Sequence, residues 1–140
     1  MDELIALMLA WLAVGFGLPE GIDPPSVRFM APEGLIAARY GSAEIDSDLD
    51  VIALYDDATR TVILRKGWDG RDAIASSVLL HELVHHVQNV AELRYACPAA
   101  REELAYEAQA RWLALFGHDL ESAFGIDQPS LRLTYVCLPD

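Results

Sequence analysis

The chain has 140 residues, of which 53% are hydrophobic and 23% are charged, and its formal net charge is -12. A length of this order is typical of one domain with its own core, and the composition is that of an ordinary globular protein. The acidic balance excludes a basic surface that neutralises phosphates, so we expect no nucleic-acid partner. The sequence therefore predicts one domain over residues 1–140.

The first apolar stretch, Leu4 to Phe16, predicts a buried helix rather than an export signal. A secretory signal begins with basic residues, whereas Asp2 and Glu3 precede this stretch and suit the positive end of a helix dipole. The stretch is also short for crossing a bilayer. We expect a helix from Asp2 to Phe16, no membrane-spanning segment and no clear signal peptide in this chain.

Three short elements are expected next, namely a strand at Ser26 to Met30, a helix at Pro32 to Tyr40 and a loop at Ser42 to Asp50. Two runs that follow are rich in β-branched and aromatic residues, as half-buried strands are. These runs, Val51 to Tyr55 and Thr61 to Arg65, flank the turn-forming residues Asp56 to Arg60. The pattern predicts an antiparallel hairpin.

The most informative stretch is His81-Glu82-Leu83-Val84-His85, inside the apolar run Ser77 to Val87. Positions four apart lie on one side of a helix, so His81 and His85 can offer their imidazoles to a single ion. Glu82 lies beside them, where its carboxylate can take a proton from a water on that ion. This H-E-x-x-H pattern is typical of zinc peptidases. The alternative is a pair of core histidines satisfied by the protein, which predicts no bound metal.

The helix that carries this motif is expected to be capped by Asp69 or Asp72 and to end near Leu93. A second helix is predicted from Ala99 to Phe116, because Gly117 follows it. The rest is expected to be irregular or weakly helical over His118 to Asp127 and extended over Leu131 to Leu138.

Cys97 and Cys137 are the only two cysteines, and neither belongs to a Cys-x-x-Cys pair of the kind that holds structural zinc. A disulfide between them would tie the tail to the connector after the motif helix. Such a bridge would suit an oxidising compartment, periplasmic or extracellular. Two unpaired thiols are the alternative.

A catalytic zinc ion needs a third protein ligand. The position at which metzincins carry a third histidine is Ala91 here, so that pattern is absent. In the second helix, Glu102 shares the apolar side with Gln109, whereas Glu103 shares the polar side with Glu107. Because a ligand must point towards the motif helix, Glu102 is the expected third ligand and Glu103 is the alternative.

The order of hairpin, H-E-x-x-H helix, connector and glutamate-bearing helix resembles the gluzincin branch of the zincin metallopeptidases. In size it is closest to the minigluzincins and to small zincin-like proteins of bacteria. The segment Glu102-Glu103-Leu104-Ala105-Tyr106 resembles the Glu-x-x-Ala-Asp/Tyr signature around their third ligand. The resemblance covers roughly residues 50–116. Many of these families have an aspartate at the position of Tyr106, where it supports the first histidine, and here Gln109, Tyr106 or Glu107 are candidates for that role.

The resemblance implies an α+β fold, a compact zincin-like single domain. In it, a small antiparallel sheet packs on the N-terminal helix, the motif helix and the glutamate-bearing helix. It also implies a substrate cleft between the motif helix and the edge of the sheet. Thr61 to Arg65 is the strand most similar to the one that pairs with an extended peptide in zincins.

The expected function is that of a zinc-dependent metallopeptidase that acts on a peptide or protein substrate. His81, His85 and Glu102 would hold Zn²⁺, and Glu82 would act as the general base. The sequence does not select the donor that would stabilise the oxyanion, and four residues are candidates, namely Tyr106, Tyr135, His86 and His118. The alternative function is a non-catalytic zincin-like module that binds a metal or a partner protein. The sequence leaves the oligomeric state open.

Overall fold

The structure is a computed structural model that describes residues 1–40 and 52–139, so the loop expected at Ser42 to Asp50 lies outside the described residues. Its strands are β1 (Ser26–Met30), β2 (Ala53–Asp56) and β3 (Thr61–Arg65). Its helices are α1 (Asp2–Phe16), α2 (Pro32–Tyr40), α3 (Ala73–Val90), α4 (Arg101–Leu115), α5 (Leu120–Phe124) and α6 (Gln128–Tyr135), with a short 3₁₀-helix η1 (Pro98–Ala100) before α4. The domain is therefore of the α+β class.

The sheet has the strand order β1-β3-β2. The hairpin of β2 and β3 is confirmed, with Asp56 opposite Thr61. The expectation of an antiparallel sheet is wrong for β1, which pairs with β3 in parallel. Parallel strands need a long connection, and the chain between β1 and the hairpin, which includes α2, supplies it.

The position of β3 also corrects the expected substrate strand. Because β3 lies between β1 and β2, both of its edges are already hydrogen-bonded within the sheet. It therefore has no edge to offer to a peptide. Among the described residues β2 pairs only with β3, so β2 is one of the two edge strands of the sheet and β1 is the other.

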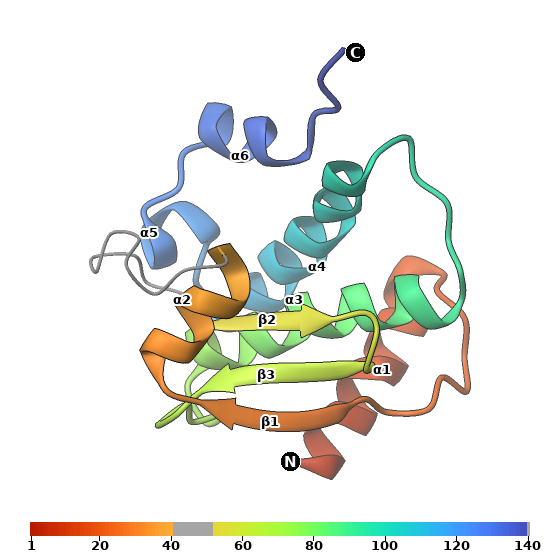
Figure 1. Cartoon of the computed structure of the whole chain (residues 1–140), viewed down its shortest axis with the longest axis vertical. Helices are drawn as coiled ribbons and strands as arrows, with labels where there is room; N and C mark the ends of the chain where they lie inside the picture. The colour runs from red at the N-terminus through yellow and green to blue at the C-terminus, as the bar shows by residue number, and fades with distance from the viewer. Residues whose placement is uncertain (41–51, 140) are drawn as a thin grey trace.

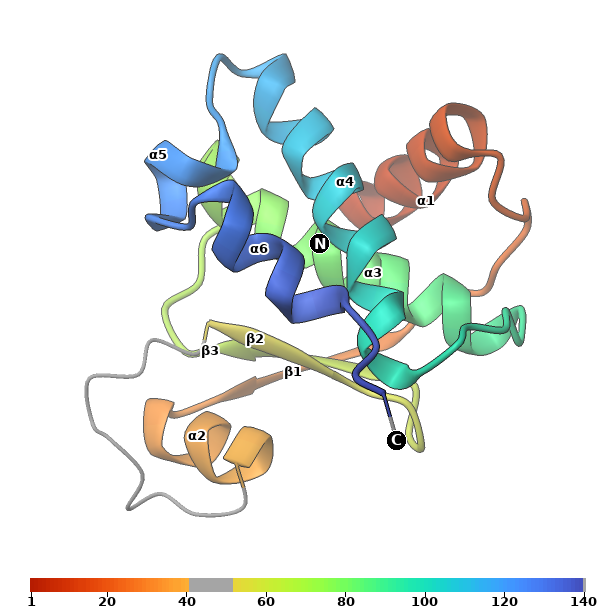
Figure 2. The same cartoon turned by 90° about the horizontal axis from the view of Figure 1, so that it is seen from above.

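The helices form layers on the two faces of the sheet. In Figures 1 and 2, α1, α3 and α4 lie on one face and α2 lies on the other. Between α3 and the sheet lies the core, in which Val62 and Leu64 of β3 pack with apolar side chains of α3. Those buried side chains are Leu79, Leu80, Leu83, Val84 and Val87. A helix that is apolar on most sides is thus central to the fold, as its composition indicated.

The ends of α3 follow from local chemistry. Of the two expected caps, Asp72 is the one used, since its side chain accepts a hydrogen bond from the Ile74 N–H at 2.9 Å. The helix ends at Val90, slightly before the predicted Leu93. This rigid helix carries the H-E-x-x-H motif through the centre of the domain.

Helix α1 forms over the predicted residues but is buried on one side only. Ile5, Met8 and Leu12 are in the core, whereas Leu7 and Val14 are exposed. The apolar composition of α1 therefore predicts more burial than the structure shows. Within the part of the chain that the structure describes, no helix has the length and apolar character needed to cross a membrane.

The C-terminal residues differ most from the sequence-based expectation. The extended tail predicted over Leu131 to Leu138 is wrong, because α6 occupies most of it. Asp127 caps this helix by accepting the Ser130 N–H at 2.8 Å, and Pro129 lies in its first turn. Leu131 then packs with buried apolar side chains of α4 and α5.

The predicted disulfide forms between Cys97 and Cys137, which are 40 residues apart. It joins the connector before η1 to the segment that follows α6. A bridge of this kind is typical of proteins in oxidising compartments.

Candidate metal centre

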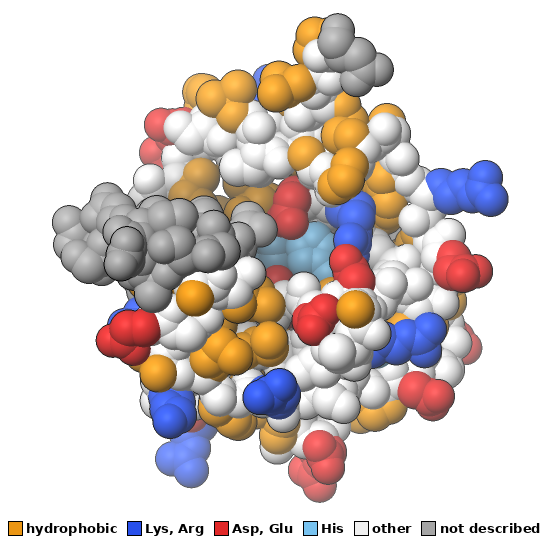
Figure 3. All heavy atoms as spheres, in the orientation of Figure 1, with side chains coloured by type: hydrophobic (Ala, Val, Ile, Leu, Met, Phe, Trp, Pro, Cys, Tyr) orange, Lys and Arg blue, Asp and Glu red, His pale blue; other side chains and the backbone are white. Residues whose placement is uncertain are grey.

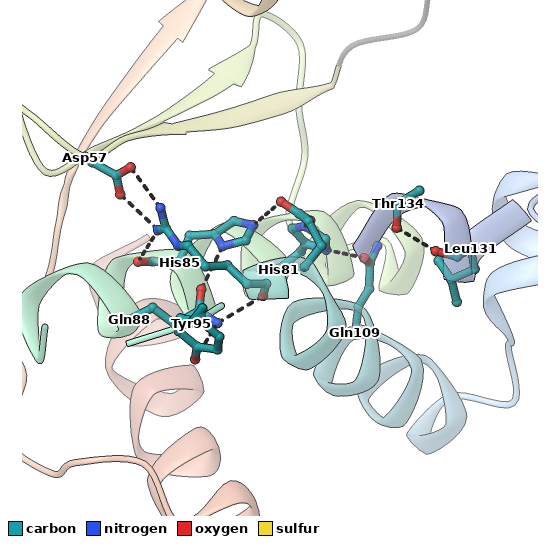
Figure 4. Close-up of polar contacts among 10 residues, drawn as sticks. Asp57, His81, His85, Gln88, Tyr95, Gln109, Leu131 and Thr134 are labelled. Carbon is teal, nitrogen blue, oxygen red and sulfur yellow. Dashed lines mark hydrogen bonds and ion pairs between the residues drawn. The ribbon is translucent and has the colours of Figure 1, made fainter. Parts of the chain in front are cut away.

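Helices α3 and α4 together bring His81, His85 and Glu102 to one point. The Nε2 atom of His81 lies 2.9 Å from Oε2 of Glu102, and the Nε2 atom of His85 lies 2.9 Å from Oε1. Each of the three residues offers one ligand atom, and these three atoms lie within 4.8 Å of one another. Glu103, the alternative third ligand, is exposed. Figure 4 shows His81 and His85 side by side on α3.

The start of α4, where Glu102 lies, is fixed by Arg101. Both terminal nitrogens of its guanidinium donate to the carboxylate of Asp57, each at 3.0 Å. One of them also donates to the main-chain oxygen of His85 at 3.3 Å. Bidentate pairs of this kind restrict geometry as well as adding energy. The β2–β3 turn and α3 therefore both hold the glutamate-bearing end of α4 in place.

Gln88 determines which nitrogen of His85 carries a proton. Its Nε2 donates to the main-chain oxygen of Arg101 at 3.0 Å, and a carbonyl oxygen can only accept. The amide oxygen of Gln88 must therefore be the atom that lies 2.9 Å from Nδ1 of His85. It accepts a hydrogen bond from Nδ1–H, which leaves the Nε2 of His85 for Glu102 or a metal.

Gln109 has the same effect on His81. The Ser77 hydroxyl donates to the main-chain oxygen of Ile74 at 2.7 Å, so the Ser77 oxygen accepts from Nε2 of Gln109 at 3.2 Å. The amide oxygen of Gln109 consequently accepts from Nδ1–H of His81 at 2.8 Å. Both histidines are thus held with Nε2 facing the cluster.

The candidates to support His81 have separate environments. Gln109 makes the hydrogen bond, and the ring of Tyr106 lies edge-on to His81 with centroids 4.6 Å apart. Glu107 pairs with Arg111 at the surface, at 3.1 Å. Of the three candidates, the amide of Gln109 is therefore the group that supports His81.

The charges in the cluster shift two pKa values in opposite directions. Burial raises the pKa of the Glu102 carboxyl, but the hydrogen bonds with His81 and His85 outweigh it and hold this pKa well below its usual range. Burial likewise lowers the pKa of His85, yet the bond to Glu102 and the charge of Glu82 raise it overall. The cluster thus favours an anionic Glu102 with positive charge beside it.

The same arrangement fits a metal ion. With Nδ1 protonated, a neutral ring directs its Nε2 lone pair at a carboxylate oxygen, which is repulsive unless a proton or a cation lies between them. Two imidazole nitrogens and one carboxylate form a common ligand set of catalytic zinc. Ligand atoms 2.9 Å apart are close to the spacing required by zinc bonds of about 2 Å. The residues present therefore fit zinc.

The cluster forms part of the floor of a cavity of about 470 Å³. Figure 3 shows histidine side chains at the bottom of a hollow in this face of the molecule. Among the described residues, the cavity is lined by Ile52, Ala53, Leu54, Tyr55, Asp57, Val78, His81, Glu82, His85, Pro98, Arg101, Glu102, Tyr106, Gln109, Leu120, Phe124 and Ile126. The site is therefore open to a ligand from outside.

Three carboxylates line this cavity among the described residues, and Asp57 and Glu102 are both paired with other side chains. The third is Glu82. Only 7% of the residue is exposed. Its side chain makes no hydrogen bond or ion pair with any residue in the described ranges 1–40 and 52–139. Its position beside the cluster makes Glu82 a candidate for proton transfer.

The other histidine of the motif region has a structural environment. His86 donates from Nε2 to the main-chain oxygen of Asp23 at 2.6 Å and accepts at Nδ1 from the Tyr55 hydroxyl at 2.8 Å. Burial lowers its pKa, which agrees with a neutral ring. Of the four residues considered as oxyanion donors, Tyr106 is the one that lines the cavity.

Sequence reasoning missed Gln88 and the pair of Asp57 with Arg101. Gln88 follows His85 by three positions, so helical spacing could have placed it beside that ring. Asp57 and Arg101 are 44 residues apart, and no local pattern connects them.

The fold and the cluster together define a small α+β protein with two histidines and a glutamate that can hold a metal ion. The chain belongs to the family described as a domain of unknown function (DUF6647), whose model matches residues 1–128. The matched range includes His81, His85 and Glu102. No curated protein and no solved structure matches the chain.

Proposed function

We propose that this protein is a zinc-dependent metallopeptidase. The observation that carries the proposal is the convergence of two Nε2 atoms on Glu102, with each ring held in the ligand form by a glutamine. The carboxylate of Glu82 lines the same cavity and makes no hydrogen bond or ion pair within the part of the chain that the structure describes, so it can supply the general base that hydrolysis requires.

In this proposal His81, His85 and Glu102 hold the zinc ion. When bound, zinc lowers the pKa of a coordinated water and polarises the carbonyl of the substrate. Glu82 accepts the proton of that water and delivers it to the nitrogen of the leaving group. Tyr106 lines the cavity beside His81 and is the candidate donor to the developing oxyanion.

The edge strand β2 supports a peptide as the substrate. Residues Ile52 to Tyr55 line the cavity, and among the described residues the only strand paired with β2 is β3. An extended peptide can therefore add to β2 through main-chain hydrogen bonds and lie across the cluster. This gives β2 the role that the sequence suggested for Thr61 to Arg65. The disulfide favours a periplasmic or secreted location.

Metal content and hydrolysis test the proposal together. We expect elemental mass spectrometry to find about one zinc per chain in protein prepared without chelator. Glu82→Gln should keep the zinc and lose peptide hydrolysis, since it removes the base and leaves the ligands. His81→Ala should lose both.

His118→Ala is the matched control, because His118 is exposed and lies outside the cavity. It should keep both the zinc and the activity. Full activity of Glu82→Gln, or no zinc uptake by the unaltered protein, would contradict the proposal. Zinc binding without hydrolysis of any peptide would instead favour a non-catalytic metal-binding module.

A further inference from the structure

A second cavity, of about 320 Å³, lies at the start of the motif helix. Its lining comes from the end of β3, from the loop that joins β3 to α3 and from the first residues of α3. Neither the three ligand residues nor Glu82 lines it. It is therefore distinct from the metal centre.

The two cavities adjoin at Ile52, which lines both and directly precedes the edge strand β2. On α3, Ala75 lines the second cavity and Val78 lines the first, and residues three apart lie on one side of a helix. The cavities therefore follow one another along α3. A ligand that extends from the metal centre towards the start of α3 enters the second cavity.

The length of an extended peptide fits the separation of the two cavities. Ala75 precedes Glu82 by seven positions in α3. This spacing corresponds to about 10 Å along the helix axis, at about 1.5 Å per residue. An extended chain covers about 3.3–3.6 Å per residue, so about three residues bridge that distance. A peptide that pairs with β2 across the metal centre can therefore reach the second cavity with a residue a few positions from the scissile bond.

The charged side chains of the second cavity differ in their partners. Asp72 accepts a main-chain N–H of the first turn of α3 at 2.9 Å, and Asp69 accepts a main-chain N–H of its own loop at 3.0 Å. Lys66 is exposed, and its ammonium makes no hydrogen bond or ion pair with any residue in the ranges 1–40 and 52–139. Arg65 lines the same cavity and adds a second positive charge. The ammonium of Lys66 therefore remains for a ligand.

We propose that the second cavity binds a carboxylate of the peptide substrate about three residues from the scissile bond. We call this cavity the lysine pocket and define it by Ile52, Lys66 and Ala75. The inference rests on the proposed peptidase function and names its substrates as peptides with an acidic side chain, or a C-terminal carboxylate, at that spacing. Because the chain as a whole carries a net charge of -12, a local positive charge determines where such a carboxylate can lie.

Calorimetry with the zinc-loaded Glu82→Gln protein tests the lysine pocket without depending on catalysis. The probes are blocked peptides that carry one Asp, at a different position in each peptide, and the same peptides with Asn. We expect the best-placed Asp peptide to bind about two- to fivefold more tightly than its Asn counterpart, which is the contribution of an exposed ion pair. This preference should decrease with added salt. Equal affinity within every Asp and Asn pair would overturn the inference.

Substitutions of Lys66 locate the effect. Lys66→Met should abolish the preference for Asp over Asn, whereas Lys66→Arg should retain it, and both variants should keep the zinc. Arg132→Met is the matched control, because it removes the same charge from an exposed residue of α6 that lines neither cavity. A preference that persists in Lys66→Met, or disappears in Arg132→Met, would refute the role of Lys66.

Chemical cross-linking identifies the amine that the peptide meets, because Lys66 is the only lysine in the sequence. A carbodiimide joins the carboxylate of a bound peptide to an amine within reach, and mass spectrometry locates the product. We expect attachment to Lys66. A peptide with a free C-terminus and no Asp is compared with the blocked Asp peptide, and the tighter binder shows which source of carboxylate the pocket takes. Attachment to the amino group of Met1 alone would contradict the inference.

Hydrolysis of the same peptides by the unaltered protein separates this inference from the proposed function. Binding that depends on Lys66 without any hydrolysis would contradict the peptidase and keep the lysine pocket as a peptide-binding site. Hydrolysis at rates that depend neither on Asp nor on Lys66 would keep the peptidase and contradict the lysine pocket. Failure of every peptide to bind would contradict both.

Discussion

At the level of single residues, neutral amides orient both histidines of the cluster. Gln109 accepts from His81 and Gln88 accepts from His85, so neither partner adds a negative charge. Glu102 is then the only anionic group hydrogen-bonded to the two rings within the described residues. A divalent ion held here keeps a net positive charge, which favours polarisation of a substrate carbonyl.

The adjacent residues Glu102 and Glu103 allow a matched test of the third ligand. Glu102→Gln should weaken zinc binding by more than the roughly 10–100-fold that changes to supporting residues cost, because it removes a ligand charge. Glu103→Gln should leave the affinity unchanged, since Glu103 is exposed. Competition with a zinc-binding dye measures both. Equal affinities of the two variants would exclude Glu102 as a ligand.

The stability of the metal-free protein should depend on pH through the same residues. The lowered pKa of Glu102 stabilises the fold above its ordinary value of 4.5, and this contribution is lost as the pH falls below that value. The raised pKa of His85 stabilises the fold below its ordinary value of 6.5, and this contribution is lost as the pH rises through the raised pKa. The cluster therefore stabilises the metal-free fold most between about pH 4.5 and 6.5.

Urea unfolding below, within and above this range measures the effect on the free energy of unfolding. Glu102→Gln should make the free energy of unfolding less dependent on pH both below pH 4.5 and above pH 6.5, because it removes the charged partner of His81 and His85. Bound zinc should maintain stability above pH 6.5, since it takes the place of the proton between a histidine Nε2 and Glu102. A metal-free protein with the same pH dependence as Glu102→Gln would contradict this account.

At the level of elements, the site depends on the packing of α3 against α4. Helix α3 is held by the core on most sides, so the directions of His81 and His85 are fixed by a rigid support. Helix α4 presents Glu102 from its first turn, where Arg101 ties it to Asp57 and to α3. Ligands on helices are positioned more accurately than ligands on loops.

The elements that sequence patterns predicted best are those with a local signal. The period of apolar residues indicated α3, and β-branched residues on both sides of a turn indicated the β2–β3 hairpin. Helix α6 was missed because its signals are weak. It is short, and its cap at Asp127 and its proline in the first turn also occur in turns.

At the level of the whole molecule, the disulfide ties the segment after α6 to the connector before α4. Cys97 lies just before η1 and α4, and Cys137 follows α6, which packs on α4. The bridge therefore connects the segment that leads to Glu102 with the segment that supports Leu120. Loss of the bridge is expected to loosen the cluster of Leu113, Leu120 and Leu131 before it affects the core around α3.

Removal of the bridge should lower the free energy of unfolding by about 2–4 kcal/mol, because it frees a long loop in the unfolded chain. The double variant Cys97→Ser, Cys137→Ser, compared with the oxidised protein in urea, measures this value. The reduced unaltered protein is the control for the serine side chains and should match the double variant. Equal stability of the oxidised protein and the double variant would contradict this expected contribution of the bridge.

The sequence by itself determined the local part of the site. The spacing of His81 and His85 on one helix, and the choice of Glu102 over Glu103 as the inward-facing glutamate, both follow from helical periodicity, which acts between residues close in the chain.

Only the tertiary structure decided the rest. The parallel pairing of β1, the edge position of β2 and the approach of Gln109 to His81 join residues that are far apart in sequence. Such contacts form because the whole chain minimises its exposed apolar area and pairs its buried polar groups, and no local pattern encodes that balance. The clearest example is the contribution of Leu120, Phe124 and Ile126 to the cavity, because Leu120 packs with Leu131 of α6, a helix that the sequence did not predict.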